Sequence, residues 1–283
     1  MMLVESIKEV RNIIKQWRTE GLSVGFVPTM GALHDGHQSL MERAVLENDR
    51  VVTSVFVNPT QFGPNEDFEA YPRDINKDYE VCKKIGVHIV FSPQAETLYF
   101  PDKSTTVHIT GLTDVLCGSK RPGHFDGVCL VVSKFFNIIQ PDKAYFGQKD
   151  AQQVAVIKRM VQDLNFDVEI VPCPIVRESD GLAKSSRNMY LSFEERKAAL
   201  VLSRSLEMAK SILDKGERNA SILKAAMLSC IIQEPLAKID YVEVVDSQDL
   251  HSISGEITRS VLIPIAVYIG KTRLIDNIIY EIS

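Results

Sequence analysis

Two histidines stand beside two glycines in the segment Pro28-Thr29-Met30-Gly31-Ala32-Leu33-His34-Asp35-Gly36-His37. An imidazole N–H donates hydrogen bonds to phosphate oxygens, and such bonds strengthen as negative charge develops on a phosphorus under attack. Glycines allow the backbone to approach a bound anion closely. These residue types at this spacing therefore indicate a nucleotide phosphate site. A zinc site is the weaker interpretation, because no Glu lies between the histidines as in H-E-x-x-H.

The segment lies where a predicted strand is followed by a predicted helix. Leu22–Val27 is short and apolar between Gly21 and Pro28, whereas Gln38–Leu46 carries apolar residues at helical spacing. Unpaired N–H groups and the positive end of the helix dipole favour an anion at such a junction. The alternative is that both histidines only complete a structural turn.

Three further groups of polar residues could act with this segment. Lys184-Ser185-Ser186-Arg187 offers cations and hydroxyls suited to closing on a triphosphate, although by itself it also fits a solvated basic turn. Gly147-Gln148-Lys149-Asp150 follows a strand and opens a helix, where Asp150 could equally be an N-cap. Asn58, Gln61 and Gln153 are neutral amides able to orient a hydroxylated carboxylate, or they are ordinary surface amides.

The elements that must position these residues alternate between strand and helix. Strand patterns occur at Leu22–Val27, Val51–Val57, Val87–Phe91, Lys143–Phe146 and Val168–Val171. Helical patterns occur at Gln38–Leu46, Ile75–Ile85, Gly127–Ile139 and Gln152–Leu164. This alternation predicts an α/β fold with a Rossmann-like, doubly wound parallel sheet, in which ligands bind beyond the carboxyl ends of the strands.

A second, smaller α+β domain is predicted from about residue 176. Residues 1–175 would form the Rossmann-like domain, and residues 176–283 the smaller C-terminal domain. Ser192 and Glu195 match a capping box that opens a long helix. The predicted elements are helices at Phe193–Lys215 and Ala220–Ile232 and strands at Tyr241–Val245, Val261–Tyr268 and Leu274–Ile279.

The composition limits the classes of partner. The 283 residues are 45% hydrophobic and 24% charged with a net charge of −5, which predicts no nucleic acid and no membrane partner. Five scattered cysteines without a C-x-x-C pair predict no disulfide framework and favour a cytoplasmic location. The charged residues within Met1–Trp17 exclude a signal peptide, and the segment is expected to be a first helix capped by Ser6.

A set of ordered motifs runs along nearly the whole chain: Pro28–His37, Val57–Gly63, Tyr71–Arg73, Arg121–Gly127, Tyr145–Gln153 and Asp180–Leu191. Together they resemble the motifs of the pantoate–β-alanine ligase (pantothenate synthetase) family. A lone H-x-G-H would indicate only the wider superfamily of nucleotidyltransferases and class I aminoacyl-tRNA synthetases. The ordered set is specific to the one family.

The resemblance implies ATP-dependent joining of (R)-pantoate to β-alanine through an enzyme-bound pantoyl adenylate, with release of diphosphate and AMP. It also implies Mg²⁺ and a cytoplasmic homodimer, without indicating the metal ligands. Pantoate is ionised at neutral pH, so its attack needs charge stabilisation rather than a general base. His34, His37, Lys149 and Arg187 suit that catalytic task, and the family usually describes the residue at His37 as a proton donor.

The resemblance also implies binding residues. Gln61 and Gln153 would hold pantoate, and Gln61 would also lie near β-alanine. The ATP-binding residues would be Met30, Gly31, Ala32, Leu33, His34, Asp35, Gly36, His37, Gly147, Gln148, Lys149, Asp150, Val176, Lys184, Ser185, Ser186 and Arg187. Many relatives carry Met at the position of Lys184 and Glu at that of Gln148, and both departures make this site more positive.

Three other functions are alternatives to this interpretation. A nucleotidyltransferase acting on a phosphorylated acceptor would share the histidine segment but form no amide. A non-catalytic ATP sensor would use the same pocket without turnover, yet it would not need the glutamines on the acceptor side. A tRNA synthetase fragment is disfavoured because no basic surface or anticodon-reading domain is evident.

Overall fold

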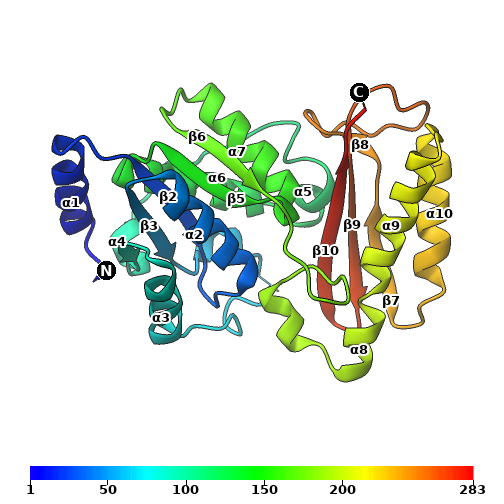
Figure 1. Cartoon of the computed structure of the whole chain (residues 1–283), viewed down its shortest axis with the longest axis horizontal. Helices are drawn as coiled ribbons and strands as arrows, with labels where there is room; N and C mark the ends of the chain where they lie inside the picture. Colours follow the sequence, from blue (N-terminus) through cyan, green and yellow to red (C-terminus); the bar gives the residue numbers. More distant parts are fainter. Residues whose placement is uncertain (65, 283) are drawn as a thin grey trace. The chain divides into compact units, whose positions relative to one another are not determined.

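A computed structural model describes residues 1–64 and 66–282 of the chain (Figure 1). The chain divides into two compact units. Unit 1 comprises Met1–Gln148 and Gln153–Pro174, and unit 2 comprises Lys149–Gln152 and the chain from Ile175 onward. Within the described residues, no helix is long and apolar enough to cross a membrane.

Unit 1 contains a sheet of six parallel strands in the order β1-β4-β3-β2-β5-β6. The strands are β1 (Met2–Val4), β2 (Val24–Thr29), β3 (Arg50–Val55), β4 (Ile89–Phe91), β5 (Lys143–Gly147) and β6 (Glu169–Cys173). From β2 the chain runs outward through β3 and β4, and it then returns to add β5 and β6 on the other side of β2. The predicted doubly wound parallel sheet is confirmed.

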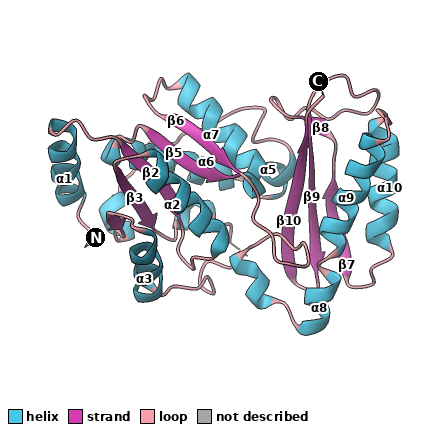
Figure 2. Cartoon of the chain, in the orientation of Figure 1, coloured by secondary structure: helices cyan, strands magenta, loops and turns pink. Residues whose placement is uncertain are grey.

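Helices cover both faces of this sheet, as Figure 2 shows in cyan. The helices of this part of the chain are α1 (Ile7–Thr19), α2 (Asp35–Glu47), α3 (Ile75–Ile85), α4 (Ala95–Leu98), α5 (Leu116–Lys120), α6 (His124–Ile139) and α7 (Ala151–Asp163). On one face, Met41 of α2 and Cys82 of α3 share an apolar core with Val27 and Val90 of the strands. On the other face, Phe135 of α6 packs edge-on against Phe26 and Phe91. The two layers follow from the alternation of side chains along each strand.

The order of the strands puts a topological switch point between β2 and β5, which pair only through Gly25 and Phe26. The histidine segment follows β2, and Gly147 ends β5. Ligands of doubly wound sheets bind outside the carboxyl ends of the strands at such a switch point. Two of the predicted site segments therefore leave the sheet on either side of it.

The structure corrects two features of unit 1. Met2–Val4 is an edge strand beside β4, so the amino end is not helical throughout. Helix α1 begins after Ser6, as predicted, and the Ser6 hydroxyl accepts the N–H of Glu9. Pro28 lies inside β2 instead of ending it. Beyond Phe26 that strand has β3 as its only sheet partner among the described residues, and a strand with one neighbour tolerates a missing N–H.

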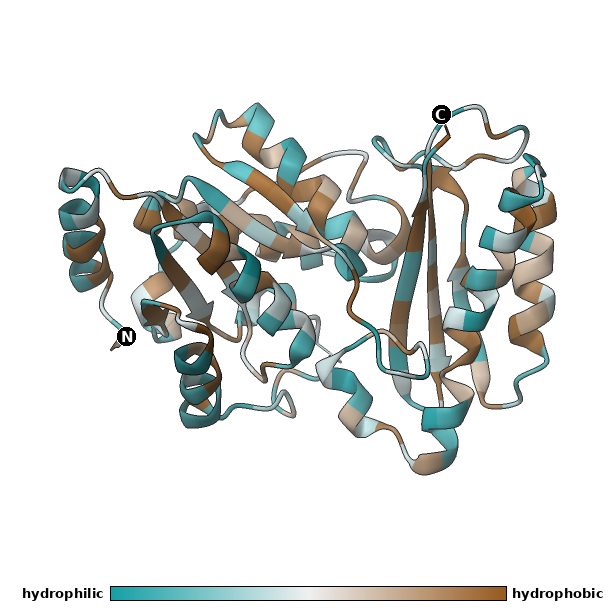
Figure 3. Ribbon diagram, in the orientation of Figure 1, coloured by the Kyte–Doolittle hydropathy of each residue, from teal (hydrophilic) through white to brown (hydrophobic). Residues whose placement is uncertain are grey.

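Unit 2 is built on a four-stranded antiparallel sheet. Its strands are β7 (Ala237–Val242), β8 (Val245–Asp246), β9 (Val261–Ile269) and β10 (Thr272–Tyr280), and β9 pairs with each of the other three. The strand β9 is apolar along nearly its whole length, as its brown ribbon in Figure 3 shows. Alternate residues of β9 enter the main core of the unit: Val261, Ile263, Ile265, Val267 and Ile269.

Three α-helices accompany this sheet: α8 (Phe193–Ala198), α9 (Val201–Asp214) and α10 (Ala220–Ile232). Leu206 of α9 and Met227 of α10 are fully buried in the same core as β9. The capping box of Ser192 and Glu195 is confirmed, with both reciprocal hydrogen bonds formed. The prediction of one long helix at Phe193–Lys215 is wrong in one respect. The helix is interrupted after Ala198, where the sequence has no Gly or Pro to mark an end.

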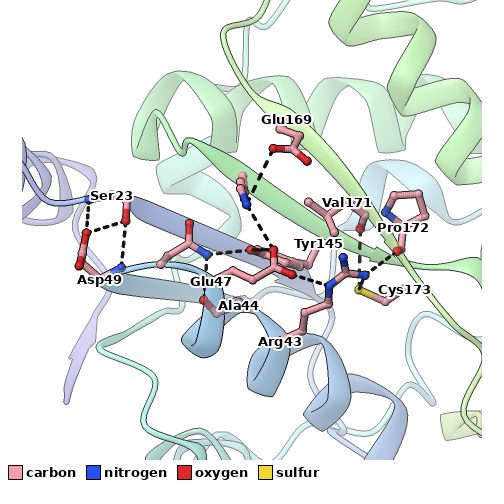
Figure 4. A network of polar contacts seen from close by, with 12 residues as sticks. Ser23, Arg43, Ala44, Glu47, Asp49, Tyr145, Glu169, Val171, Pro172 and Cys173 are labelled. Atoms are coloured by element: carbon pink, nitrogen blue, oxygen red, sulfur yellow. Dashed lines mark hydrogen bonds and ion pairs between the residues drawn. The ribbon is translucent and has the colours of Figure 1, made fainter.

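A polar network fastens the carboxyl end of α2 to the sheet of unit 1 (Figure 4). The buried Tyr145 hydroxyl of β5 donates to Glu47 over 2.9 Å and accepts from the amide of Asn48 over 2.7 Å. Arg43 pairs with Glu47 and donates to the backbone oxygen of Pro172 in β6. Burial raises the pKa of Tyr145, so its hydroxyl remains a donor at neutral pH. The network links α2, whose other end carries the histidines, to β5 and β6.

Tyr145→Phe removes this buried hydroxyl while retaining the ring. We expect the free energy of unfolding to fall by about 1–2 kcal/mol, because two buried hydrogen bonds are lost. Urea denaturation followed by circular dichroism measures the change. Tyr79→Phe is the matched control, since its hydroxyl bonds the backbone oxygen of Met1 in an exposed setting, and we expect a loss below about 0.5 kcal/mol. Equal losses in the two variants would contradict the role of the network.

Candidate functional site

The two histidines form the first turn of α2 and cap it. His34 is the N-cap residue, and its Nδ1 accepts the N–H of Gly36 over 3.1 Å. His37 returns the contact, because its Nδ1 accepts the N–H of His34 over 3.3 Å. The two rings are in contact and tilted, with centroids 4.0 Å apart and planes inclined by 34°. Helix α2 therefore begins earlier than predicted, since histidines serve here as caps in place of the usual Ser, Thr, Asp or Asn.

This capping arrangement sets the donor atom of each ring. A backbone N–H donates to each Nδ1, so Nδ1 carries no proton and the proton of the neutral ring is on Nε2. Both imidazoles therefore have Nε2–H as their donor, at the N-terminus of a 13-residue helix. Donors and a helix dipole of this sign stabilise negative charge. Both histidines therefore complete a structural turn, and their geometry is compatible with an anion site.

The loop before the histidines is held by a carboxylate that the sequence analysis missed. Asp78 of α3 is 2% exposed, and it accepts the N–H of Ala32 over 3.0 Å and the N–H of Leu33 over 2.9 Å. Burial raises the pKa of its carboxyl, although these two hydrogen bonds act in the opposite direction. An acidic residue on the apolar face of α3, one turn before Cys82, was the signal available in the sequence.

Glycine is required at position 31 of this loop. Gly31 has a φ of +83°, and a Cβ there would lie 2.7 Å from a carboxylate oxygen of Asp78. Its N–H donates to the hydroxyl of Thr29 over 3.2 Å. Ala32 follows with a φ of +50°. The backbone is thus turned so that successive N–H groups have buried acceptors, and the side chain of position 31 must be absent.

Gln61 lies on the short 3₁₀ helix η1 (Pro59–Gln61), which follows β3, the neighbour of β2. Its amide nitrogen donates to the sulfur of Met30 over 3.2 Å, and its amide oxygen accepts from Asn58 over 3.0 Å. The structure therefore brings Gln61 to the histidine loop. With its oxygen engaged by Asn58, the residue turns its NH₂ group toward that loop.

The orientation of Asn58 is itself fixed. This residue is 1% exposed, and its oxygen accepts the hydroxyl protons of Thr60 and Tyr99, each over 2.8 Å. Its NH₂ group donates to the backbone oxygen of Gly127 over 3.1 Å. Burial raises the pKa of Tyr99 to about 12, so that hydroxyl stays protonated. Asn58 is a structural support of Gln61 in this arrangement.

The segment after β5 forms another 3₁₀ turn, η2 (Gln148–Asp150), directly before α7. The backbone oxygen of Lys149 accepts from the amide of Asn277 in β10 over 2.9 Å, and both residues belong to unit 2. Gln153 is half-buried in the first turn of α7. Within residues 1–64 and 66–282, no hydrogen bond joins Gln153 to Gln61, so the two predicted pantoate ligands are not linked directly.

The predicted site residues from Val176 onward lie on a hairpin and the turn after it. Arg177 and Ala183 pair as an antiparallel bridge, and the N–H of Lys184 donates to the oxygen of Val176. The ammonium of Lys184 lies 2.8 Å from the carboxylate of Glu178. The additional cation at this position is therefore paired with an acid of its own hairpin, which moderates the gain in positive charge expected from the sequence.

A buried ion pair anchors this hairpin to the sheet of unit 2. Both nitrogens of the Arg177 guanidinium fork bond the carboxylate of Asp276 in β10, over 2.7 Å and 3.0 Å. The Asp276 side chain is 1% exposed, so the pair is shielded from water on the acid side. Ser185 then caps the 3₁₀ turn η3 (Ser186–Tyr190) by accepting the N–H of Arg187. Arg187 is thus held at a defined turn on an anchored hairpin.

Comparisons with known proteins agree with the resemblance that the motifs indicate. A family model for pantoate-beta-alanine ligases matches residues 2–279. The pantothenate synthetase of Clostridium acetobutylicum is 62% identical over 282 residues, covering 100% of both chains. A pantothenate synthetase structure from Thermus thermophilus has a TM-score of 0.93 at 43% identity, covering 98% of this chain and 99% of that chain. A Francisella tularensis pantoate-beta-alanine ligase, complexed with beta-gamma ATP and beta-alanine, has a TM-score of 0.78 at 34% identity, covering 98% and 97%.

Asp78→Ala tests the support of the histidine loop. We expect hydrogen exchange of the backbone amides in residues 29–37 to accelerate, because two buried N–H groups lose their acceptor, and the free energy of unfolding to fall by about 1–3 kcal/mol. Hydrogen-exchange mass spectrometry measures the first change and urea denaturation the second. Glu80→Ala, on an exposed position of the same helix, is the control and should leave both unchanged. Unaltered exchange in Asp78→Ala would show that the carboxylate does not hold the loop.

Proposed function

This chain belongs to the pantoate-beta-alanine ligase family, and from that premise we propose that it joins (R)-pantoate to β-alanine with cleavage of ATP to AMP and diphosphate. The observation that carries the proposal is the pair of histidines that cap α2, with Gln61 hydrogen-bonded to the preceding loop. The residues proposed to bind the phosphates of ATP therefore lie next to the amide proposed to bind pantoate. The Francisella tularensis relative, complexed with beta-gamma ATP and beta-alanine, supports these two ligands.

In the first step, a carboxylate oxygen of pantoate attacks the α-phosphorus of ATP. A new P–O bond gives pantoyl adenylate, and the bond to the β-phosphate oxygen breaks to release diphosphate. The nucleophile is already ionised, so the residues mainly stabilise charge on the phosphates. We assign this role to the Nε2–H groups of His34 and His37 and to the cations Lys149 and Arg187.

Gln61 and Gln153 are proposed to hold pantoate. An amide donates to and accepts from hydroxyl and carboxylate groups without neutralising the nucleophile, as a fixed cation would. The orientation of Gln61 supports this role, since its NH₂ group is turned toward the histidine loop. In the second step, the neutral amine of β-alanine attacks the acyl carbon. The C–N bond of the amide forms, the bond between the acyl carbon and the phosphate oxygen breaks to release AMP, and the amine nitrogen loses one proton to the solvent. Gln61 would also lie near β-alanine in that step.

The remaining ATP contacts are assigned to both units. Met30–His37, Gly147 and Gln148 belong to unit 1, whereas Lys149, Asp150, the backbone at Val176 and the segment Lys184–Arg187 belong to unit 2. We propose that residues 1–175 bind ATP and pantoate, and that residues 176–283 close over the active site. In this structure the ammonium of Lys184 is paired with Glu178 of the same hairpin.

Magnesium is proposed to enter with ATP. Mg²⁺ keeps several waters and prefers phosphate oxygens with few protein ligands, which suits a site made of imidazoles, amides and backbone N–H groups. Mg²⁺ would neutralise charge on the triphosphate. It would be held through the phosphates, and therefore by the residues that bind them. We further propose a homodimer located in the cytoplasm.

Two alternatives make different predictions about the products. A nucleotidyltransferase acting on a phosphorylated acceptor would release diphosphate without forming AMP and an amide together. An ATP sensor would bind the nucleotide without turnover. Incubation of the purified protein with ATP, Mg²⁺, pantoate and β-alanine, omitting each in turn, tests the proposed function. AMP and pantothenate should appear only in the complete mixture, and binding without AMP release would favour the sensor.

His37→Ala and His37→Asn separate the catalytic role of the ring from its role as a cap. We expect both variants to form pantoyl adenylate about 10²–10³-fold more slowly, since each lacks the Nε2–H donor. The Asn side chain retains an acceptor for the N–H of His34, so His37→Asn should keep the unfolding free energy near that of the wild type. Rapid-quench single-turnover measurements follow the adenylate. A rate near the wild-type value in either variant would remove His37 from the chemistry.

A further inference from the structure

No residue of the motif Arg121–Gly127 is among the ATP-binding or substrate-binding residues assigned above. The motif forms the entry to α6, with Gly123 in the left-handed region at a φ of +79° and the helix beginning at His124. The turn that bears Gln61 is the neighbour of this helix entry in unit 1, as two kinds of contact show. They are the bond of His124 to the Gln61 backbone and the close packing at Gly127.

The His124 ring connects the helix entry to the backbone of the substrate residue. Its Nδ1 lies 2.8 Å from the backbone oxygen of Gln61, and its Nε2 lies 3.0 Å from a guanidinium nitrogen of Arg121. A carbonyl only accepts and a guanidinium only donates, so the ring is neutral with its proton on Nδ1. His124 is therefore a hydrogen-bond relay from Arg121 to the Gln61 carbonyl.

The far end of this relay is held by an acid. Arg121 forms two bonds to the carboxylate of Glu66, each of 2.6 Å, and both side chains are largely shielded, at 18% and 25% exposed. Although burial alone would raise it, the guanidinium of Arg121 holds the pKa of the Glu66 carboxyl below its ordinary value. The guanidinium is thus fixed by a bidentate pair, which gives its remaining N–H a defined direction toward His124.

Close packing joins the same two elements independently of the ring. A Cβ at Gly127 would lie 2.3 Å from the backbone oxygen of Thr60, so only glycine allows α6 to approach the η1 turn this closely. The amide of Asn58 donates to the backbone oxygen of Gly127 over 3.1 Å. The turn carrying Gln61 is therefore seated on the first turn of α6, and His124 bonds its last residue.

From these contacts we infer that His124 is a positioning residue for Gln61: its Nδ1–H holds the Gln61 carbonyl, while Arg121 and Glu66 hold the ring. The inference rests on the proposed function in one respect, namely that Gln61 binds pantoate. His124 acts through the backbone of Gln61 and touches none of the reacting atoms in this scheme. Its loss affects the binding of the acceptor and spares that of ATP.

Shape-matched substitutions test the inference. His124→Asn places an amide donor near the position of Nδ1, whereas His124→Leu has the same branching without a donor. We expect His124→Leu to raise KM for pantoate about tenfold, on the scale of one lost hydrogen bond, with KM for ATP changed less than about twofold. His124→Asn should restore KM for pantoate to within about threefold of wild type. Steady-state kinetics of AMP release, with pantoate and ATP varied separately, measure both constants.

A double-mutant cycle asks whether the effect passes through Gln61. We expect Gln61→Ala to weaken pantoate binding less in the His124→Leu background than in the wild type, because the positioning is already lost. His108→Ala is the control, since this exposed histidine pairs with Asp126 of α6, and no hydrogen bond or ion pair among the described residues joins it to the turn. Arg121→Met removes the guanidinium that bonds the His124 ring. It should raise KM for pantoate without raising KM for ATP, and it provides a second test if His124→Leu fails to fold.

The outcomes separate the inference from the proposed function. If the wild-type protein does not release AMP in the presence of pantoate and β-alanine, the proposed function is wrong. If the wild type is active but His124→Leu and His124→Asn behave alike, the ring only fills space and the inference is wrong. Equal increases in the two KM values, or additive effects in the cycle, would overturn it as well.

Discussion

Asp78 accepts the backbone N–H groups of Ala32 and Leu33 beneath the loop that leads to the histidines, and the rest of the site depends on this pair of hydrogen bonds. The loop departs from regular strand geometry at Gly31 and Ala32, both with positive φ, so its N–H groups have no strand or helix partners. Buried N–H groups without an acceptor are costly. A carboxylate from a different helix resolves this conflict, and its position excludes any side chain at Gly31.

The loop in turn determines how the histidines are used. Because it delivers His34 as the N-cap of α2, each Nδ1 is engaged by a backbone N–H and each ring keeps Nε2–H as its donor. The network of Arg43, Glu47 and Tyr145 holds the other end of α2 against the sheet. Both ends of the helix that orients the donors are therefore fixed within unit 1. Such prior orientation is what allows hydrogen-bond donors to stabilise developing charge without reorganisation.

The same principle recurs in the support of Gln61 and of the hairpin in unit 2. Gln61 is held through its side chain by Asn58 and through its backbone by His124. In unit 2, Arg177 is held by Asp276, and Lys184 by Glu178. In each case a polar partner fixes a residue that contacts ligand in the proposed scheme or supports the segment that does. The proposed chemistry thus relies, in this chain, on a set of buried or half-buried polar pairs.

The sequence by itself determined the fold class, most of the elements and the family. Hydrophobic periodicity is a local property, so Ile75–Ile85 and Ala220–Ile232 were predicted with the same bounds as α3 and α10. Motif spacing is also readable along the chain, and it indicated the histidine loop and Gln61. Only the tertiary structure decided that Asp78 supports that loop and that His124 supports Gln61, because these partners lie 45 or more residues apart along the chain. It also decided which nitrogen of His34 and His37 bears the proton, since a tautomer follows from the hydrogen-bond partner and the partner from the fold.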